Sequence, residues 1–132
     1  HAFQDKPYRF RLLFLVRNKV ELYARIEQRI DQMLSDGLEV EVKTLMGRGY
    51  RPDLIAMQGL GYKQFIQHFL GNMTREETIT LLKRDTRRYA KRQFTWFRRE
   101  PESCWVDITG IKEPEEIAGR IKKNIEISND LV

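Results

Sequence analysis

Residues Thr74 to Arg99 read TREETITLLKRDTRRYAKRQFTWFRR, and this stretch predicts the longest helix of the chain. Thr74 and Glu77 stand at the spacing of a capping box, in which each side chain bonds the backbone N–H of the other residue. Ile79 and Leu82 follow as apolar positions on the same helix. We therefore expect a helix that begins at Thr74 and ends at about Phe97.

The second half of this predicted helix is strongly basic. From Lys83 to Arg99 there are eight basic residues and one acidic residue, Asp85, so this segment carries +7 while the whole chain carries +5. On a helical wheel, one face holds Arg84, Arg87, Arg88, Lys91, Arg92, Thr95, Arg98 and Arg99, and the opposite face holds Leu82, Tyr89, Gln93, Trp96 and Phe97.

A basic stripe of this kind has two readings. Charged stripes are usually solvated faces, but solvated helices mix both signs of charge to form i,i+4 pairs. Because this helix does not, we interpret the stripe as a contact for the phosphate backbone and unstacked bases of a nucleic acid. The aromatic face opposite would fasten the helix to the rest of the protein.

The remaining sequence predicts a helix-rich α/β chain. Tyr8 to Val16 reads as a strand that enters a buried sheet, Asn18 as the N-cap of a helix from Lys19 to Ser35, and Gly37 as its C-terminal stop. Two short strands cannot form a stable sheet alone, so we expect further strands outside the chain. The other expected elements are helices at about Leu38–Met46, Lys63–Leu70 and Pro114–Ile127, a short segment at Leu54–Met57 and a strand at Trp105–Ile108.

Length and composition suit one globular domain. The chain has 132 residues, of which 41% are hydrophobic and 33% charged. The apolar run Leu12 to Val16 is too short to cross a bilayer, and we recognise no signal peptide. Cys104 is the single cysteine, which excludes an internal disulfide and a cysteine-rich metal site. We expect an intracellular protein, and the start at His1 instead of methionine predicts a fragment or a processed chain.

Arg29 is the most informative residue outside the basic helix. The apolar stripe of the predicted helix Lys19–Ser35 consists of Leu22, Tyr23, Ile26, Ile30, Met33 and Leu34. The helical wheel places Arg29 close to Leu22 and Met33, beside this stripe and away from solvent. A guanidinium on the buried side of a helix is costly unless an anion compensates its charge. Its planar group of N–H donors can bond two oxygens of a phosphate or a carboxylate at once. From its position alone, an internal salt bridge and an external phosphate both remain open.

No complete catalytic set is recognisable from the residues themselves. Gly59 to Lys63 resembles half of a phosphate loop, but the glycines fit a tight turn and a helix start better, and Gln58 could bond a base edge or cap the turn. His68 has no second ligand at metal spacing, so we predict no metal site in the chain. The residues alone indicate a basic, helix-rich, nucleic-acid-binding module.

Several segments together resemble the C-terminal part of the tRNA dimethylallyltransferase (tRNA isopentenyltransferase) family. The most specific is Thr86 to Arg98, and the resemblance spans roughly Tyr8 to Ile127. The other matching segments are Leu22–Leu34, Gly37–Leu38 through Glu41–Val42, Met57–Lys63 and Trp105–Asp107.

The resemblance implies an enzyme that transfers a dimethylallyl group from its diphosphate to N6 of the adenosine 3′ to the anticodon. It implies a P-loop-type α/β core with Mg²⁺, and a target adenine that is flipped out of the anticodon loop. It further implies a cytoplasmic enzyme that is monomeric in its full form. Its expected partners are the tRNA anticodon stem-loop and dimethylallyl diphosphate, with no membrane contact.

The resemblance also implies roles for individual residues. Arg29 matches the arginine that stabilises the departing diphosphate, which favours the phosphate reading of this residue. The segments Asp53 to Gln58 and Thr86 to Gln93 match those that contact the tRNA. The expected tRNA-binding residues are Asp53, Met57, Gln58, Thr86, Arg87, Arg88, Lys91, Arg92 and Gln93.

The P-loop and the catalytic aspartate of the family have no counterpart here, so residues 1–132 are expected to be one C-terminal fragment that is inactive alone. The main alternative is a stand-alone, non-catalytic RNA-binding module that uses the basic helix 83–99. A third possibility is a protein-interaction domain whose basic stripe meets an acidic partner.

Overall fold

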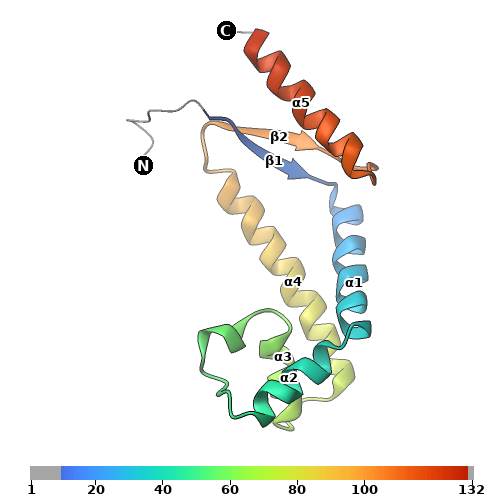
Figure 1. Cartoon of the computed structure of the whole chain (residues 1–132), viewed down its shortest axis with the longest axis vertical. Coiled ribbons are helices and arrows are strands. Elements are labelled where there is room, and N and C mark those ends of the chain that lie inside the picture. Colours follow the sequence, from blue (N-terminus) through green and yellow to red (C-terminus); the bar gives the residue numbers. More distant parts are fainter. Residues whose placement is uncertain (1–9, 131–132) are drawn as a thin grey trace. The chain divides into compact units, whose positions relative to one another are not determined.

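A computed structural model describes residues 10–130 of the chain, with side chains described to residue 126. The described chain forms two compact units, one made of residues 10–21 and 94–130 and the other of residues 22–93. In chain order the elements are β1 (Leu12–Val16), α1 (Lys19–Ser35), α2 (Leu38–Gly47), the 3-10 helix η1 (Ile55–Gln58), α3 (Tyr62–Phe69), α4 (Arg75–Phe97), β2 (Ser103–Asp107) and α5 (Pro114–Asp130) (Figure 1). None of the described helices is long and apolar enough to cross a membrane.

The expected helix-rich α/β class is confirmed by the two strands and five α-helices of the described chain. β1 and β2 pair in parallel, with a register that runs from Leu12 opposite Ser103 to Val16 opposite Asp107. A parallel pair needs a long connection between its strands, and here residues 17–102 supply it. Further strands beside this pair stay a prediction, and Tyr8 and Arg9 lie outside the described residues.

Three of the predicted helix ends are confirmed: the start and the end of α1 and the start of α4. The Asn18 carboxamide oxygen accepts a hydrogen bond from the Glu21 N–H at 2.8 Å. At the start of α4, the Thr74 hydroxyl accepts from the Glu77 N–H at 3.1 Å, and the Glu77 carboxylate accepts from the Thr74 N–H at 3.3 Å. Gly37 adopts the left-handed conformation, with a φ of 100°, between α1 and α2.

In the first unit, aromatic side chains pack against the strands. Phe97 stacks on Phe14 with ring centroids 4.3 Å apart, and Phe94 stacks on Trp105 at 6.0 Å. The aromatic face predicted for α4 is therefore only partly right, because Tyr89 and Trp96 are 48% and 62% exposed. Phe97 of the predicted face does pack on the strands, and Phe94, which was not predicted, packs with it because residues three apart share one side of a helix.

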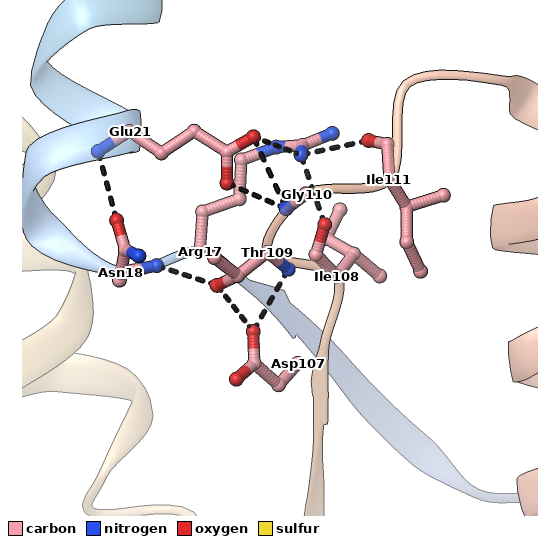
Figure 2. A network of polar contacts seen from close by, with 8 residues as sticks. All are labelled: Arg17, Asn18, Glu21, Asp107, Ile108, Thr109, Gly110 and Ile111. Atoms are coloured by element: carbon pink, nitrogen blue, oxygen red, sulfur yellow. Dashed lines mark hydrogen bonds and ion pairs between the residues drawn. The ribbon is translucent and has the colours of Figure 1, made fainter.

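A polar network joins the end of β1 to the loop that follows β2 (Figure 2). The Arg17 guanidinium donates hydrogen bonds to the carbonyls of Ile108 and Ile111, at 2.9 and 2.8 Å, and pairs with Glu21 at 3.2 Å. The Glu21 carboxylate in turn accepts from the Gly110 N–H at 3.0 Å. Since the Arg17 side chain is only 10% exposed, these bonds satisfy a charge that is largely removed from water.

The second unit has a hydrophobic core between helices. Its buried members are Ile30, Leu38, Val42, Met57, Phe65, Ile66 and Leu82. Ile26, Met33 and Leu34 pack against this core, as the apolar stripe of α1 predicts. The core thus receives side chains from α1, α2, η1, α3 and α4, and it fixes the surface that these elements share.

Replacing Arg17 by methionine tests the polar network. We expect Arg17→Met to lower the local opening free energy of β2 by about 2 kcal/mol, because the carbonyls of Ile108 and Ile111 lose a charged donor. Hydrogen exchange of the Val106 and Ile108 amides measures this change. Lys122→Met is the control, because Lys122 is an exposed cation of α5, and it should leave protection within about 0.5 kcal/mol of the wild type. Equal protection in both variants would contradict the assigned role of Arg17.

Candidate nucleic-acid interface

A cationic pocket lies on the second unit, between the start of α3 and the middle of α4. Its volume is about 660 Å³. One wall is the turn Gln58–Leu60, and the other is the row Arg84, Arg88 and Arg92, which repeats every fourth residue and therefore follows one side of α4. The other lining residues are Lys63, Gln64, Asp85 and Tyr89.

Two other basic residues of α4 point to α1 instead. Lys83 pairs with Asp31 at 3.1 Å, and Arg87 pairs with Glu27 at 3.4 Å. Lys83 and Arg87 are four residues apart on α4, and their partners Asp31 and Glu27 are four residues apart on α1. The basic residues of α4 and the acidic residues of α1 therefore face each other one turn at a time. The predicted common face of Arg84, Arg87 and Arg88 is therefore divided in the structure, because Arg87 pairs with Glu27 of α1 while Arg84 and Arg88 line the pocket. A contact of Arg87 with tRNA stays a prediction.

The predicted contacts of the η1 segment lie at different depths. Gln58 lines the pocket and is exposed. Asp53 is exposed and pairs with Arg51 at 3.0 Å. Met57 is only 3% exposed and belongs to the core, so its side chain anchors η1 and does not reach the surface.

On α4, the predicted residues also differ in what their side chains do. Arg88 and Arg92 are exposed at the pocket, and Lys91 and Gln93 are exposed on the same helix. The Thr86 hydroxyl donates to the Leu82 carbonyl at 2.7 Å and is half-buried, so it faces the helix itself. The structure therefore brings Gln58, Arg88 and Arg92 together and keeps Met57 and Thr86 apart from them.

A buried amide links the two walls of the pocket. The Gln64 side chain is 2% exposed, accepts from the Gly61 N–H at 2.8 Å and donates to the Asp85 carboxylate at 3.0 Å. The other Asp85 oxygen accepts from the Arg84 guanidinium at 3.1 Å. Sequence reasoning missed this link, although Asp85 was visible as the single acidic residue of the basic run.

The Asp85 carboxylate is held in its charged form. Burial raises its pKa, but hydrogen bonds from Gln64 and Arg84 and the charges of Arg84 and Lys63 outweigh this effect. The resulting pKa lies below the ordinary aspartate value. At neutral pH, the pocket wall therefore contains a carboxylate whose charge is compensated within the protein.

Arg29 is placed differently from its prediction. The position beside the apolar stripe and away from solvent is wrong, because Arg29 is exposed. The packed face of α1 is centred on Ile26 and Ile30, and Arg29 lies beyond its edge. Within residues 10–130 the structure gives Arg29 no ion pair or hydrogen bond, so no described carboxylate supports the internal salt bridge.

The described residues provide no metal centre. Among them, no group of three or more histidine, cysteine, aspartate or glutamate side chains could hold an ion. We therefore assign no magnesium ligand to this part of the chain.

Comparison with known protein families gives one match that covers most of the chain. Residues 1–100 match the family model described as IPP transferase.

Curated relatives agree with this match. The chain is 51% identical over 115 residues to the tRNA dimethylallyltransferase of Alkaliphilus metalliredigens, covering 87% of this chain and 36% of the relative. It is 49% identical over 107 residues to the tRNA dimethylallyltransferase of Syntrophobacter fumaroxidans, covering 81% and 31%. The chain thus spans about a third of the length of these curated relatives.

Solved structures share the fold. The full-length tRNA isopentenylpyrophosphate transferase of Bacillus halodurans matches with a TM-score of 0.78 and 38% identity, over 96% of this chain and 44% of that one. The tRNA isopentenylpyrophosphate transferase of Staphylococcus epidermidis matches with a TM-score of 0.77 and 32% identity, over 89% and 38%.

Proposed function

The chain belongs to the IPP transferase family, and we propose that it forms part of a tRNA dimethylallyltransferase. The reaction transfers a dimethylallyl group from its diphosphate to N6 of the adenosine 3′ to the anticodon. The observation that carries the proposal is the match of residues 1–100 to the family, together with relatives of about 50% identity that bear this name.

The cationic pocket supports a role in tRNA binding. Lys63, Arg88 and Arg92 supply positive charge for phosphates, and the half-exposed ring of Tyr89 lies beside them as a surface on which a base can stack. Gln58 on the opposite wall can bond a base edge. Asp53, Lys91 and Gln93 extend the proposed contact beyond the pocket.

Arg29 is the residue we assign to the chemical step. As N6 attacks the allylic carbon, the carbon–oxygen bond to the diphosphate breaks and negative charge develops on the leaving group. A guanidinium that faces solvent and has no described partner is available to bind that charge. Arg29 would therefore stabilise the departing diphosphate, while the proton of N6 passes to an aspartate that we do not assign among the described residues.

The remaining parts of the proposal follow from the family. The substrates are the anticodon stem-loop of a tRNA and dimethylallyl diphosphate, and the enzyme acts as a cytoplasmic monomer. Mg²⁺ would supply charge neutralisation on the diphosphate, with no ligand assigned among residues 10–130.

A transfer assay with the full-length protein tests the assignment of Arg29. Arg29→Ala should lower kcat by about 10²- to 10³-fold and leave the Kd for tRNA unchanged, because the lost interaction forms mainly in the transition state. Arg48→Ala is the matched control, since Arg48 is exposed, carries the same charge and lies outside the pocket. An unchanged kcat in Arg29→Ala would remove its catalytic role, and a wild-type protein without transfer activity would overturn the proposed function.

The salt dependence of tRNA binding tests the pocket. Arg88→Ala and Arg92→Ala should each weaken binding and reduce the slope of log K against log salt by about one unit, because each removes one phosphate contact. The slope of Arg48→Ala should equal that of the wild type. Slopes that do not change in either pocket variant would show that the phosphates bind elsewhere.

A further inference from the structure

The two hydrogen bonds of the Gln64 side chain, to the Gly61 N–H and to the Asp85 carboxylate, form a bridge between two segments that are distant in sequence. Gln64 lies in the first turn of α3, and Asp85 lies 21 residues later on α4. Both ends of the Gln64 amide are used, one for the Gly61 N–H at 2.8 Å and one for Asp85 at 3.0 Å. A buried amide without these partners would cost free energy, so the side chain requires both walls to stay in place.

The bridge also reaches the backbone of the turn. Gly61 has a φ of 96°, a conformation that L-residues with side chains rarely adopt, and a Cβ there would lie 3.2 Å from the Leu38 side chain. The turn is therefore tightly packed on one side and bonded to Gln64 on the other. Gln64 also bonds Asp85 of α4, and Asp85 bonds Arg84 of the same helix. The turn is therefore connected by hydrogen bonds to the helix that carries Arg88 and Arg92.

Asp85 carries a negative charge in the wall of a pocket that we assign to a negatively charged ligand. A carboxylate in the wall of a phosphate-binding pocket repels the ligand unless the protein compensates it. Arg84 and Gln64 compensate both of its oxygens, at 3.1 and 3.0 Å. The negative charge of Asp85 thus weakens RNA binding, whereas its hydrogen bond to Gln64 strengthens binding by holding the pocket walls in place. Substitutions that remove the charge with and without the hydrogen bond can separate the two effects.

We propose that Gln64 and Asp85 are positioning residues for tRNA binding. Their bridge holds the Gln58–Gly61 turn against the Arg84–Arg88–Arg92 row, so that one preformed pocket receives an unpaired nucleotide of the RNA. Gln58 then faces the base edge, while Arg88 and Arg92 face its phosphates. This inference rests on the proposed function of the chain in tRNA binding.

Two substitutions of Asp85 that change the charge equally provide the test. Asp85→Asn and Asp85→Ala both remove one negative charge, which by charge alone should tighten tRNA binding in each. The asparagine side chain keeps an oxygen that can accept from the Gln64 amide, whereas alanine leaves the amide without this partner. In the full-length protein we therefore expect Asp85→Asn to bind tRNA at least as tightly as the wild type, and Asp85→Ala to bind it about tenfold more weakly.

A second pair of variants tests the bridge from its other end. Gln64→Glu places a carboxylate against Asp85 and should weaken tRNA binding by about tenfold or more. Adding Asp85→Asn should restore binding to within about threefold of the wild type, because the introduced glutamate can accept from both the Gly61 N–H and the introduced asparagine amide. The KM for dimethylallyl diphosphate should not change in any of these variants. Circular dichroism at the assay temperature shows which variants are folded.

The outcomes are separable. Weaker binding in Asp85→Ala than in Asp85→Asn, with rescue of Gln64→Glu by Asp85→Asn, supports the proposal. Equal binding in the two Asp85 variants, or no rescue, overturns it while the proposed function stands. If Asp85→Ala does not fold, the rescue alone decides. A wild-type protein that binds no tRNA would overturn both the proposed function and this inference.

Discussion

The candidate site depends on two hydrogen bonds of the Gln64 side chain, which accepts from the Gly61 N–H and donates to Asp85. They join a glycine turn to a charged helix through one buried amide. The hydrophobic core alone brings α3 and α4 together, but apolar contacts are not directional. Hydrogen bonds of 2.8 and 3.0 Å add a defined register between the pocket walls. The positive row of α4 can then face Gln58 at a fixed distance, as a preorganised binding site requires.

The acidic residues near α4 determine where its positive charge is available. Asp31 and Glu27 pair with Lys83 and Arg87, so these cations face α1. Arg88 and Arg92 face the pocket. A helix whose sequence has one basic stripe therefore presents a narrower binding row. Ion pairs at the protein surface contribute little free energy, so the main consequence of these two partly exposed pairs is the orientation of Lys83 and Arg87.

Local signals predicted the elements well, while contacts between elements were not predictable from one sequence. Asn18, Gly37 and the pair Thr74–Glu77 fixed helix ends because caps depend on neighbouring residues. The exposure of Arg29 and the Gln64–Asp85 bridge depend on which helices pack together, and helical periodicity does not contain that information. For the site, the sequence predicted Gln58, Arg88 and Arg92 but missed the pair that holds them.

Photocrosslinking of tRNA to the full-length protein tests the central claim most directly. A tRNA with a photoreactive base in its anticodon loop should form crosslinks in the peptides that contain Gln58 and Tyr89, because both line the pocket that we assign to an unpaired nucleotide. Asp85→Ala should reduce these crosslinks, and Asp85→Asn should keep them. Crosslinks confined to other surfaces, with Gln58 and Tyr89 unlabelled in the wild type, would contradict the account.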